Sequence, residues 1–89
     1  MTAPHGSAGA VSVRLFAAAR ELAGMDECRL EIPDGAKAGY VLDHLESLAP
    51  RFRDWRPVIR LAVNREYVDL AHPLQDGDEV AVIPPVSGG

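Results

Sequence analysis

The last four residues, Val-Ser-Gly-Gly, suggest chemistry that needs no side chain. Glycine has nothing beyond its backbone with which to bind or react, so any reactivity at Gly89 belongs to its α-carboxylate. Two glycines also let a main chain pass a constriction that a Cβ atom would block. Gly88 and Gly89 therefore predict a reactive carboxylate on a chain thin enough to enter a narrow site.

The other residues that could do chemistry form no catalytic or metal-binding pattern. Cys28 alternates in phase with Leu30 and Ile32, which predicts a core thiol rather than a nucleophile. The acidic stretch 76–79 is typical of a solvated turn. Three histidines have no partner at the spacing of a catalytic triad or a metal site: His5, His44 and His72. We expect no bound metal or cofactor and no active-site pocket within this chain.

Composition narrows the possible partners. Eighty-nine residues with 47% hydrophobic content predict one small domain. A net charge of −4 without a basic stripe argues against nucleic acid and anionic membranes, and weakly favours a basic protein partner. No apolar run is long enough for a membrane helix and the start has no signal-peptide pattern, so we expect a cytoplasmic protein with one unbridged cysteine.

Alternating hydrophobicity predicts the strands. Residues 11–16 and 27–32 alternate with period two on either side of a short helical turn. Residues 58–64 and 79–83 predict two further strands, and 65–70 a short strand or turn. The order β-β-α-β-β predicts an α+β domain in which a mixed sheet carries one main helix on one face.

The main helix is expected at about residues 36–49. Apolar residues recur there at helical spacing and form one stripe: Ala38, Val41, Leu42, Leu45, Leu48 and Ala49. Gly39 weakens its first turn, and Pro50 ends it. With the strand alternation, this stripe predicts a core that includes Val13, Leu15, Leu30, Leu42, Leu45, Val63 and Val80.

The chain is expected to divide into three parts. Residues 1–10 are rich in Ala, Gly and Ser and predict a disordered extension, and 11–84 form the domain. Residues 85–89 predict a flexible, reactive tail, because Pro84 and Pro85 stop the strand and nothing from Val80 onward is charged. Pro85, Val86, Ser87 and Gly88 would thread the tail into a partner.

Three segments carry a family resemblance: LFAAARELAG, AVNREYV and LQDGDEVAVIPPVSGG. They resemble the small subunit of molybdopterin synthase, a family of ubiquitin-like sulfur carriers with a β-grasp fold. The similarity spans residues 11–89 and is most specific in the terminal block. Gly39 and Tyr40 in the helix depart from the family pattern.

The resemblance implies a mechanism for the tail. An E1-like adenylating enzyme would use ATP to activate the carboxylate of Gly89, and sulfur from a persulfide donor would displace AMP to give a thiocarboxylate. In the active site of the large subunit of molybdopterin synthase, this sulfur would pass to cyclic pyranopterin monophosphate. The chain itself would be a sulfur-donor subunit that binds no cofactor.

A docking face is expected beside the tail. Strand alternation places Phe16 and Ile83 on the sheet face away from the helix. The resemblance places a partner-contacting apolar residue at Tyr67. These three are the expected partner-binding residues, although Phe16 could instead fold around an edge into a secondary core.

Three other functions remain open on the sequence. A sulfur carrier for thiamine, cysteine or tRNA thiolation would share the fold and the terminal glycines. A ubiquitin-like modifier would form isopeptides, and Lys37 would be its only internal acceptor. A simple binding module would tolerate the loss of Gly89.

Overall fold

The computed structural model describes residues 9–85, which form three helices and five strands. In chain order these are β1 (Gly9–Leu15), α1 (Ala17–Ala23), β2 (Glu27–Ile32), α2 (Gly39–Leu48), α3 (Phe52–Trp55), β3 (Arg60–Val63), β4 (Glu66–Val68) and β5 (Glu79–Ile83). No helix of this part of the chain is long and apolar enough to span a membrane.

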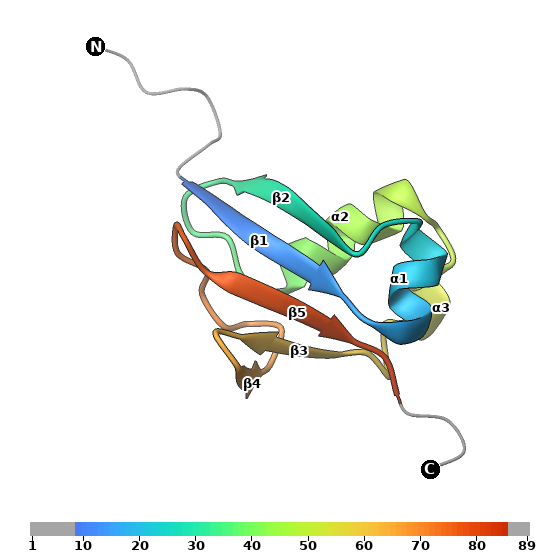
Figure 1. The fold of residues 1–89 in the computed structure, drawn as a ribbon. Coiled ribbons are helices and arrows are strands. Elements are labelled where there is room, and N and C mark those ends of the chain that lie inside the picture. The colour runs from blue at the N-terminus through green and yellow to red at the C-terminus, as the bar shows by residue number, and fades with distance from the viewer. Residues whose placement is uncertain (1–8, 86–89) are drawn as a thin grey trace.

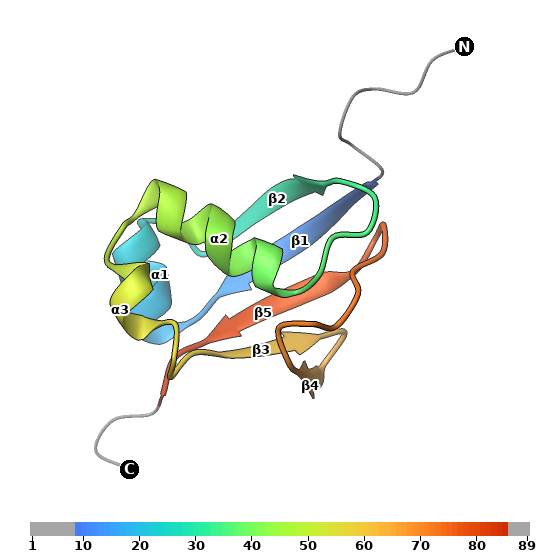
Figure 2. The ribbon, with the colours of Figure 1, turned by 180° about the vertical axis from the view of Figure 1, so that it is seen from behind.

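The strands form one mixed sheet in the order β2-β1-β5-β3-β4. The first and last strands, β1 and β5, pair in parallel at its centre, and the other neighbours are antiparallel. α2 crosses one face, and the opposite face is open (Figures 1 and 2). This is the β-grasp fold that the sequence predicts.

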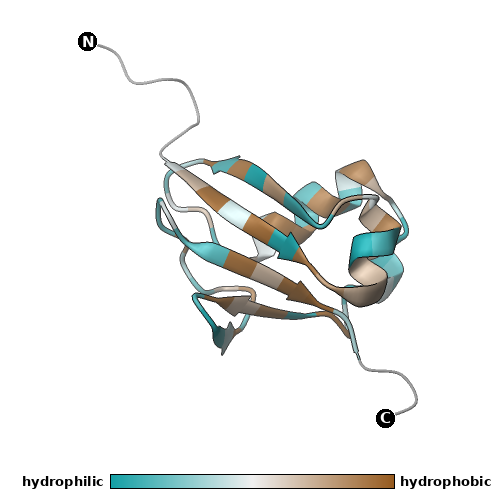
Figure 3. Ribbon diagram, in the orientation of Figure 1, coloured by the Kyte–Doolittle hydropathy of each residue, from teal (hydrophilic) through white to brown (hydrophobic). Residues whose placement is uncertain are grey.

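The alternating sequence pattern decides which side chains enter the core. In β1 and β2 the hydrophobic and polar bands alternate along each strand (Figure 3), as they must when one face is covered and the other is open. All seven predicted core residues are buried: Val13, Leu15, Leu30, Leu42, Leu45, Val63 and Val80. Their burial confirms the predicted phase of the alternation.

The helix α2 is shorter than the sequence predicts at its N-terminal end. The residues before it are held in a loop, where the Ala38 N–H donates to the carbonyl of His72 at 2.8 Å and Lys37 forms a β-bridge with Pro73. These long-range contacts delay the first helical turn to Gly39.

The predicted apolar stripe packs against the core, except for Leu48. Val41, Leu42 and Leu45 are fully buried, but Leu48 is 53% exposed. The core continues instead with Phe52, from the short helix α3. Arg56 ties α3 to α2, since its guanidinium donates to Asp43 at 2.7 Å and to Glu46 at 2.8 Å. Both hydrogen bonds raise the pKa of Arg56, and the one to Glu46 has the larger effect.

The strand β1 begins at Gly9, two residues before the expected boundary between extension and domain. Ala10 is buried there, and its N–H donates to the Asp76 carboxylate at 2.8 Å. Asp76 lies in the turn before β5, so this contact joins residues that are far apart in sequence and invisible to a local pattern.

Candidate functional site

The site is built around the end of β5, where the chain leaves the sheet. Val82 and Pro84 are buried, Ile83 is half-buried, and Pro85 is exposed. On the β1 side, the last contact is the Phe16 N–H, which donates to the carbonyl of Val82 at 3.3 Å, and on the β3 side Ile83 still pairs with Arg60. Proline has no N–H for a further ladder bond, so the strand stops at Pro84, as expected. Val86, Ser87, Gly88 and Gly89, the expected threading and reactive residues, lie outside the described residues.

A groove of about 700 Å³ lies beside this exit, and we call it the tail-root groove. It brings together Phe16, Ile83 and Pro85, three of the residues that the sequence predicts to contact partners. Its lining residues are Phe16, Ala17, Ala18, Glu21, Ile83, Pro84 and Pro85. All except Glu21 are apolar, so the groove can take an apolar side chain of a partner.

The backbone between β1 and α1 aims Phe16 into this groove. Phe16 is extended, with φ −117° and ψ 150°, and Ala17 follows with a left-handed φ of 51°. Such a reversal turns the chain directly from strand into helix and leaves Phe16 outside the core. Phe16 is 42% exposed, so it does not fold into a secondary core.

Tyr67 lies on the same open face but not in the groove. It pairs across β4 and β3 with Ala62, which pairs in turn with Ala81 of β5. Paired residues on neighbouring strands project to the same face. Tyr67 is 63% exposed and lies under the guanidinium of Arg60, 4.8 Å from the ring centroid. The structure therefore places two of the three predicted docking residues together and the third farther along the sheet.

A second hollow, of about 290 Å³, flanks the two prolines on their other side. It is lined by Ala18, Trp55, Val58, Pro84 and Pro85. Val58 is 51% exposed, and Trp55 packs its inner side against the core. α1 and α3 lie together at this end of the sheet (Figures 1 and 2). The sequence pattern of a charged connector did not single out Trp55 or Val58.

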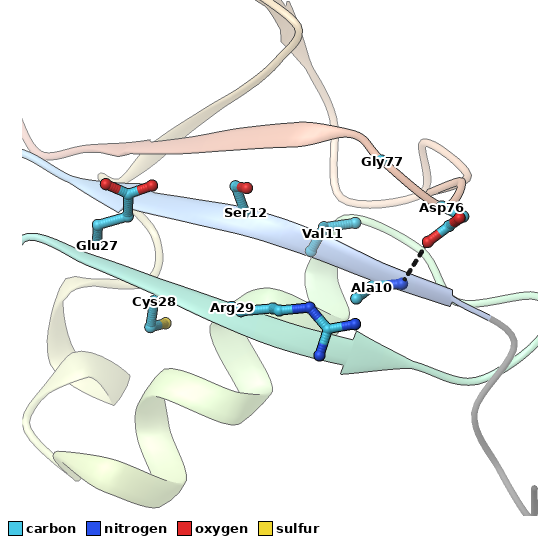
Figure 4. A pocket seen from close by; sticks show the side chains of 8 residues that line it. All are labelled: Ala10, Val11, Ser12, Glu27, Cys28, Arg29, Asp76 and Gly77. Atoms are coloured by element: carbon cyan, nitrogen blue, oxygen red, sulfur yellow. Dashed lines mark hydrogen bonds between the residues drawn. The ribbon is translucent and has the colours of Figure 1, made fainter.

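A third hollow, near the start of β1, has no reactive arrangement. Ser12 and Glu27 point to one side of the sheet there, and Cys28 points to the other (Figure 4). Burial, and then the nearby charge of Glu27, raise the pKa of the Cys28 thiol. A raised pKa keeps the sulfur protonated at neutral pH, so Cys28 is a poor nucleophile. It packs against the core, as its phase in the strand predicts.

The two histidines in the described part of the chain, His44 on α2 and His72 in the loop before β5, are on separate elements. Over residues 9–85, no three His, Cys, Asp or Glu side chains are grouped to hold a metal ion. This part of the chain presents surfaces around the point where the chain leaves the sheet after β5.

Sequence comparison identifies relatives of this chain. The model of the ThiS family matches residues 13–89. A molybdopterin synthase sulfur carrier subunit from Arabidopsis thaliana is 40% identical over 79 residues, covering 89% of this chain and 82% of the relative. A protein of the same name from Homo sapiens is 40% identical over 82 residues, covering 89% of this chain and 93% of the relative.

Solved structures show the same fold. The putative molybdopterin converting factor subunit 1 from Pyrococcus furiosus matches with a TM-score of 0.78 and 34% identity, over 89% of this chain and 100% of that one. SAMP1 from Haloferax volcanii matches with a TM-score of 0.78 and 32% identity, over 91% of this chain and 100% of that one. A chain in a protein–protein complex of subunits 1 and 2 of the molybdopterin-converting factor from Helicobacter pylori also matches. Its TM-score is 0.60 and its identity 27%, over 90% of this chain and 99% of that one.

Proposed function

The chain belongs to the ThiS family, and because its relatives are molybdopterin synthase sulfur carrier subunits, we propose that it carries sulfur in the biosynthesis of the molybdenum cofactor. The sulfur is held as a thiocarboxylate at the carboxyl end of Gly89. The observation that carries this proposal is the exit of β5 through Pro84 and Pro85 beside an apolar groove.

The chemical steps follow from the poor reactivity of a free carboxylate. An oxygen of the Gly89 carboxylate attacks the α-phosphate of ATP, and pyrophosphate leaves. The resulting acyl adenylate is an electrophile, so the terminal sulfur of a persulfide attacks it and displaces AMP to give an acyl disulfide. A second thiol of the activating system then cleaves the S–S bond, which releases the thiocarboxylate and leaves a disulfide on the donor. The dithiolene of molybdopterin contains two sulfur atoms, so two thiocarboxylate chains in turn donate one sulfur each to cyclic pyranopterin monophosphate. Hydrolysis releases each chain with its Gly89 carboxylate restored.

Partner enzymes supply the acid–base and substrate-binding groups in this scheme. The large subunit of molybdopterin synthase holds the acceptor, and the solved Helicobacter pylori complex of subunits 1 and 2 supports a partner of this kind. An E1-like adenylating enzyme forms the acyl adenylate. ATP and the sulfur donor belong to that activating system, the chain binds no cofactor of its own, and the reactions take place in the cytoplasm.

The tail-root groove is consistent with a scheme in which this chain supplies the tail and its partners supply the catalytic groups. An apolar groove at the root of a tail lets a partner grip the domain and receive the tail at the same time. Phe16 and Ile83 provide side chains for that grip, and Pro85 begins the segment that enters the partner. Tyr67 extends the contact along the open face of the sheet.

Protein modification is a second candidate function, because SAMP1 of Haloferax volcanii shares the fold at 32% identity and small archaeal modifier protein is the name of that group. Such a modifier would attach its Gly89 carbonyl to lysine amines of other proteins. Its one internal acceptor, Lys37, is exposed just before α2. Lysates containing stable conjugates of higher mass would favour this function.

Intact-mass spectrometry tests the sulfur-carrier proposal. The purified chain is incubated with ATP, the activating enzyme and a sulfur source, and a gain of about 16 Da is expected as one oxygen is replaced by sulfur. A chain that lacks Gly89 is the matched control and should keep its mass. An unchanged mass of the full chain, with an activating enzyme that is active on another carrier, would contradict the proposal.

A further inference from the structure

The strand β2 forms one edge of the sheet (Figure 1). Along its sequence, ECRLEI, exposed charged residues alternate with residues that are partly or fully buried. The exposed set is Glu27, Arg29 and Glu31. Arg29 pairs with Ser12 of β1, which is exposed on the open face, so all three charged side chains project from that face. The edge therefore carries a short row of alternating charge.

The hydrogen-bond pattern shows which backbone groups of β2 are available at this edge. The Leu15 N–H donates to the carbonyl of Asp26 at 3.0 Å, which makes these two residues a hydrogen-bonded pair. Hydrogen-bonded and non-hydrogen-bonded pairs alternate along an antiparallel ladder. The even-numbered residues of β2 thus direct their N–H and C=O groups toward β1, and the odd-numbered residues direct theirs outward. Within residues 9–85, no backbone group outside the ladder with β1 bonds to these outward groups.

Unpaired N–H and C=O groups at an edge are a template for another strand. A second copy of β2 can supply that strand in antiparallel orientation, provided that odd-numbered residues face odd-numbered residues. Two registers then keep five residues of each β2 paired, residues 27–31 in one and 28–32 in the other. Their charges separate them.

The register over residues 27–31 opposes like charges. It places Arg29 opposite the same residue of the partner and Glu27 opposite the partner's Glu31. Like charges directly opposite each other destabilise a strand pair. The register over residues 28–32 instead places Arg29 opposite the partner's Glu31, and does so twice because of the two-fold symmetry. Opposite charges directly across a strand pair stabilise it.

The matched register also uses an ion pair that each chain already contains. Arg29 lies 3.5 Å from Glu31 along its own strand, and both side chains are well exposed. Two arginines and two glutamates therefore alternate around the two-fold axis, and each arginine has one carboxylate along the strand and one across it. On the covered face, Leu30 lies opposite the same residue of the partner and adds an apolar contact at the axis.

We propose that β2 is a self-association edge, at which two copies of this chain pair antiparallel with Arg29 opposite the partner's Glu31 and join their sheets into one. The same surface is used by both copies, so the interface closes on itself. Charged edge strands usually prevent pairing, but here the alternation of sign allows one register. β1 separates β2 from β5, so pairing at this edge leaves the tail-root groove open.

Charge-swapped variants test the edge and its register. Self-association of the full chain is followed by sedimentation equilibrium at chain concentrations up to about 1 mM, since an interface of one short strand pair is weak. The original chain should show a monomer–dimer equilibrium. Arg29→Glu and Glu31→Arg should each weaken the dimer about tenfold or more, because each places like charges opposite each other.

Two rescues separate the register from a general effect of charge. The double variant, Arg29→Glu with Glu31→Arg, restores opposite charges and keeps the net charge at −4, so its dimer should be within about threefold of the original. A mixture of the two single variants should form heterodimers, because one chain carries two carboxylates and the other two guanidinium groups. Arg53→Glu, exposed on α3, is the control for net charge and should change the dimer less than about twofold.

Four results would overturn the proposal. The chain has no self-associating edge if it stays monomeric at every concentration. A stronger dimer of Glu31→Arg would indicate the register in which Glu27 faces residue 31 of the partner. A loss with Arg29→Glu but not with Glu31→Arg would indicate a shorter register, in which Arg29 faces the partner's Glu27. A double variant that is folded but not rescued would exclude the matched register.

The variants must be folded for this comparison. Residues 29 and 31 are exposed, so melting temperatures within about 2 °C of the original are expected. The inference does not rest on the proposed function. A chain that gains no sulfur in the mass experiment refutes the sulfur-carrier proposal alone, and a monomeric chain that carries sulfur refutes self-association alone.

Discussion

The two faces of the sheet use the same strands for different purposes. Val80 and Val82 of β5 are completely buried beneath α2, whereas Ala81 and Ile83 of the same strand face the open side. On the helix side nearly every position is a large aliphatic residue. On the open side, small residues lie between arginines and aromatic rings. Because side chains alternate along a strand, one short segment can hold the fold together and also present a surface to a partner.

The difference between the faces explains how the domain can serve the proposed reaction at its tail. The closed face fixes the position of β5, and β5 fixes the point where the tail leaves. The open face and the tail-root groove are free for partners. Substitutions on the closed face should therefore change stability, and substitutions on the open face should change binding.

The largest effect on stability is expected at the centre of the closed face. Leu45 of α2 is fully buried, so Leu45→Ala should lower the free energy of unfolding by about 2–5 kcal/mol through lost burial and a cavity. Leu48→Ala on the same helix is the matched control. Leu48 is 53% exposed, and its removal should cost less than about 0.5 kcal/mol. Urea denaturation measures both, and equal losses would contradict the placement of the core.

The next effect is on binding. Phe16→Ala or Ile83→Ala should weaken binding to a partner by about 1–3 kcal/mol, because both side chains line the tail-root groove. Calorimetry with the large subunit and with the activating enzyme measures the change. Leu70→Ala removes an exposed apolar side chain away from the groove and should leave both affinities unchanged. Unaltered affinity of both groove variants for both partners would refute the docking face.

The smallest effect concerns the thiol that the mechanism does not use. Cys28 has a raised pKa and is partly buried, so iodoacetamide should alkylate it several-fold more slowly at pH 8 than it alkylates the urea-unfolded chain. The folded state disfavours the thiolate, so stability should fall slightly as the pH rises above about 8.5, the usual pKa of an unfolded cysteine. Equal alkylation rates would indicate that Cys28 is open and reactive.

The closed face could be predicted from the sequence, and the open face only in part. Alternation and helical spacing are local signals, and they identified the strands, the main helix and the core. The pairing of Arg60 with Ile83, by contrast, depends on the register between strands that are far apart in sequence. The position of Phe16 depends on the left-handed backbone at Ala17, and an alanine in the sequence does not predict that conformation. Leu48 fitted the stripe but is 53% exposed, whereas Phe52 of α3, which the stripe did not include, is buried in the core.

The central claim is that the domain holds and presents the tail, and that the reaction takes place at Gly89. The direct test is the yield of molybdopterin from cyclic pyranopterin monophosphate when the large subunit is supplied with this chain after activation. Gly89→Val, or deletion of Gly89, should abolish sulfur transfer and leave the melting temperature nearly unchanged. A β-branched side chain beside the reacting carboxylate would obstruct the narrow partner site that the tail is proposed to enter and would misplace the acyl group, while no core contact is lost. Undiminished molybdopterin formation by either variant would contradict the account.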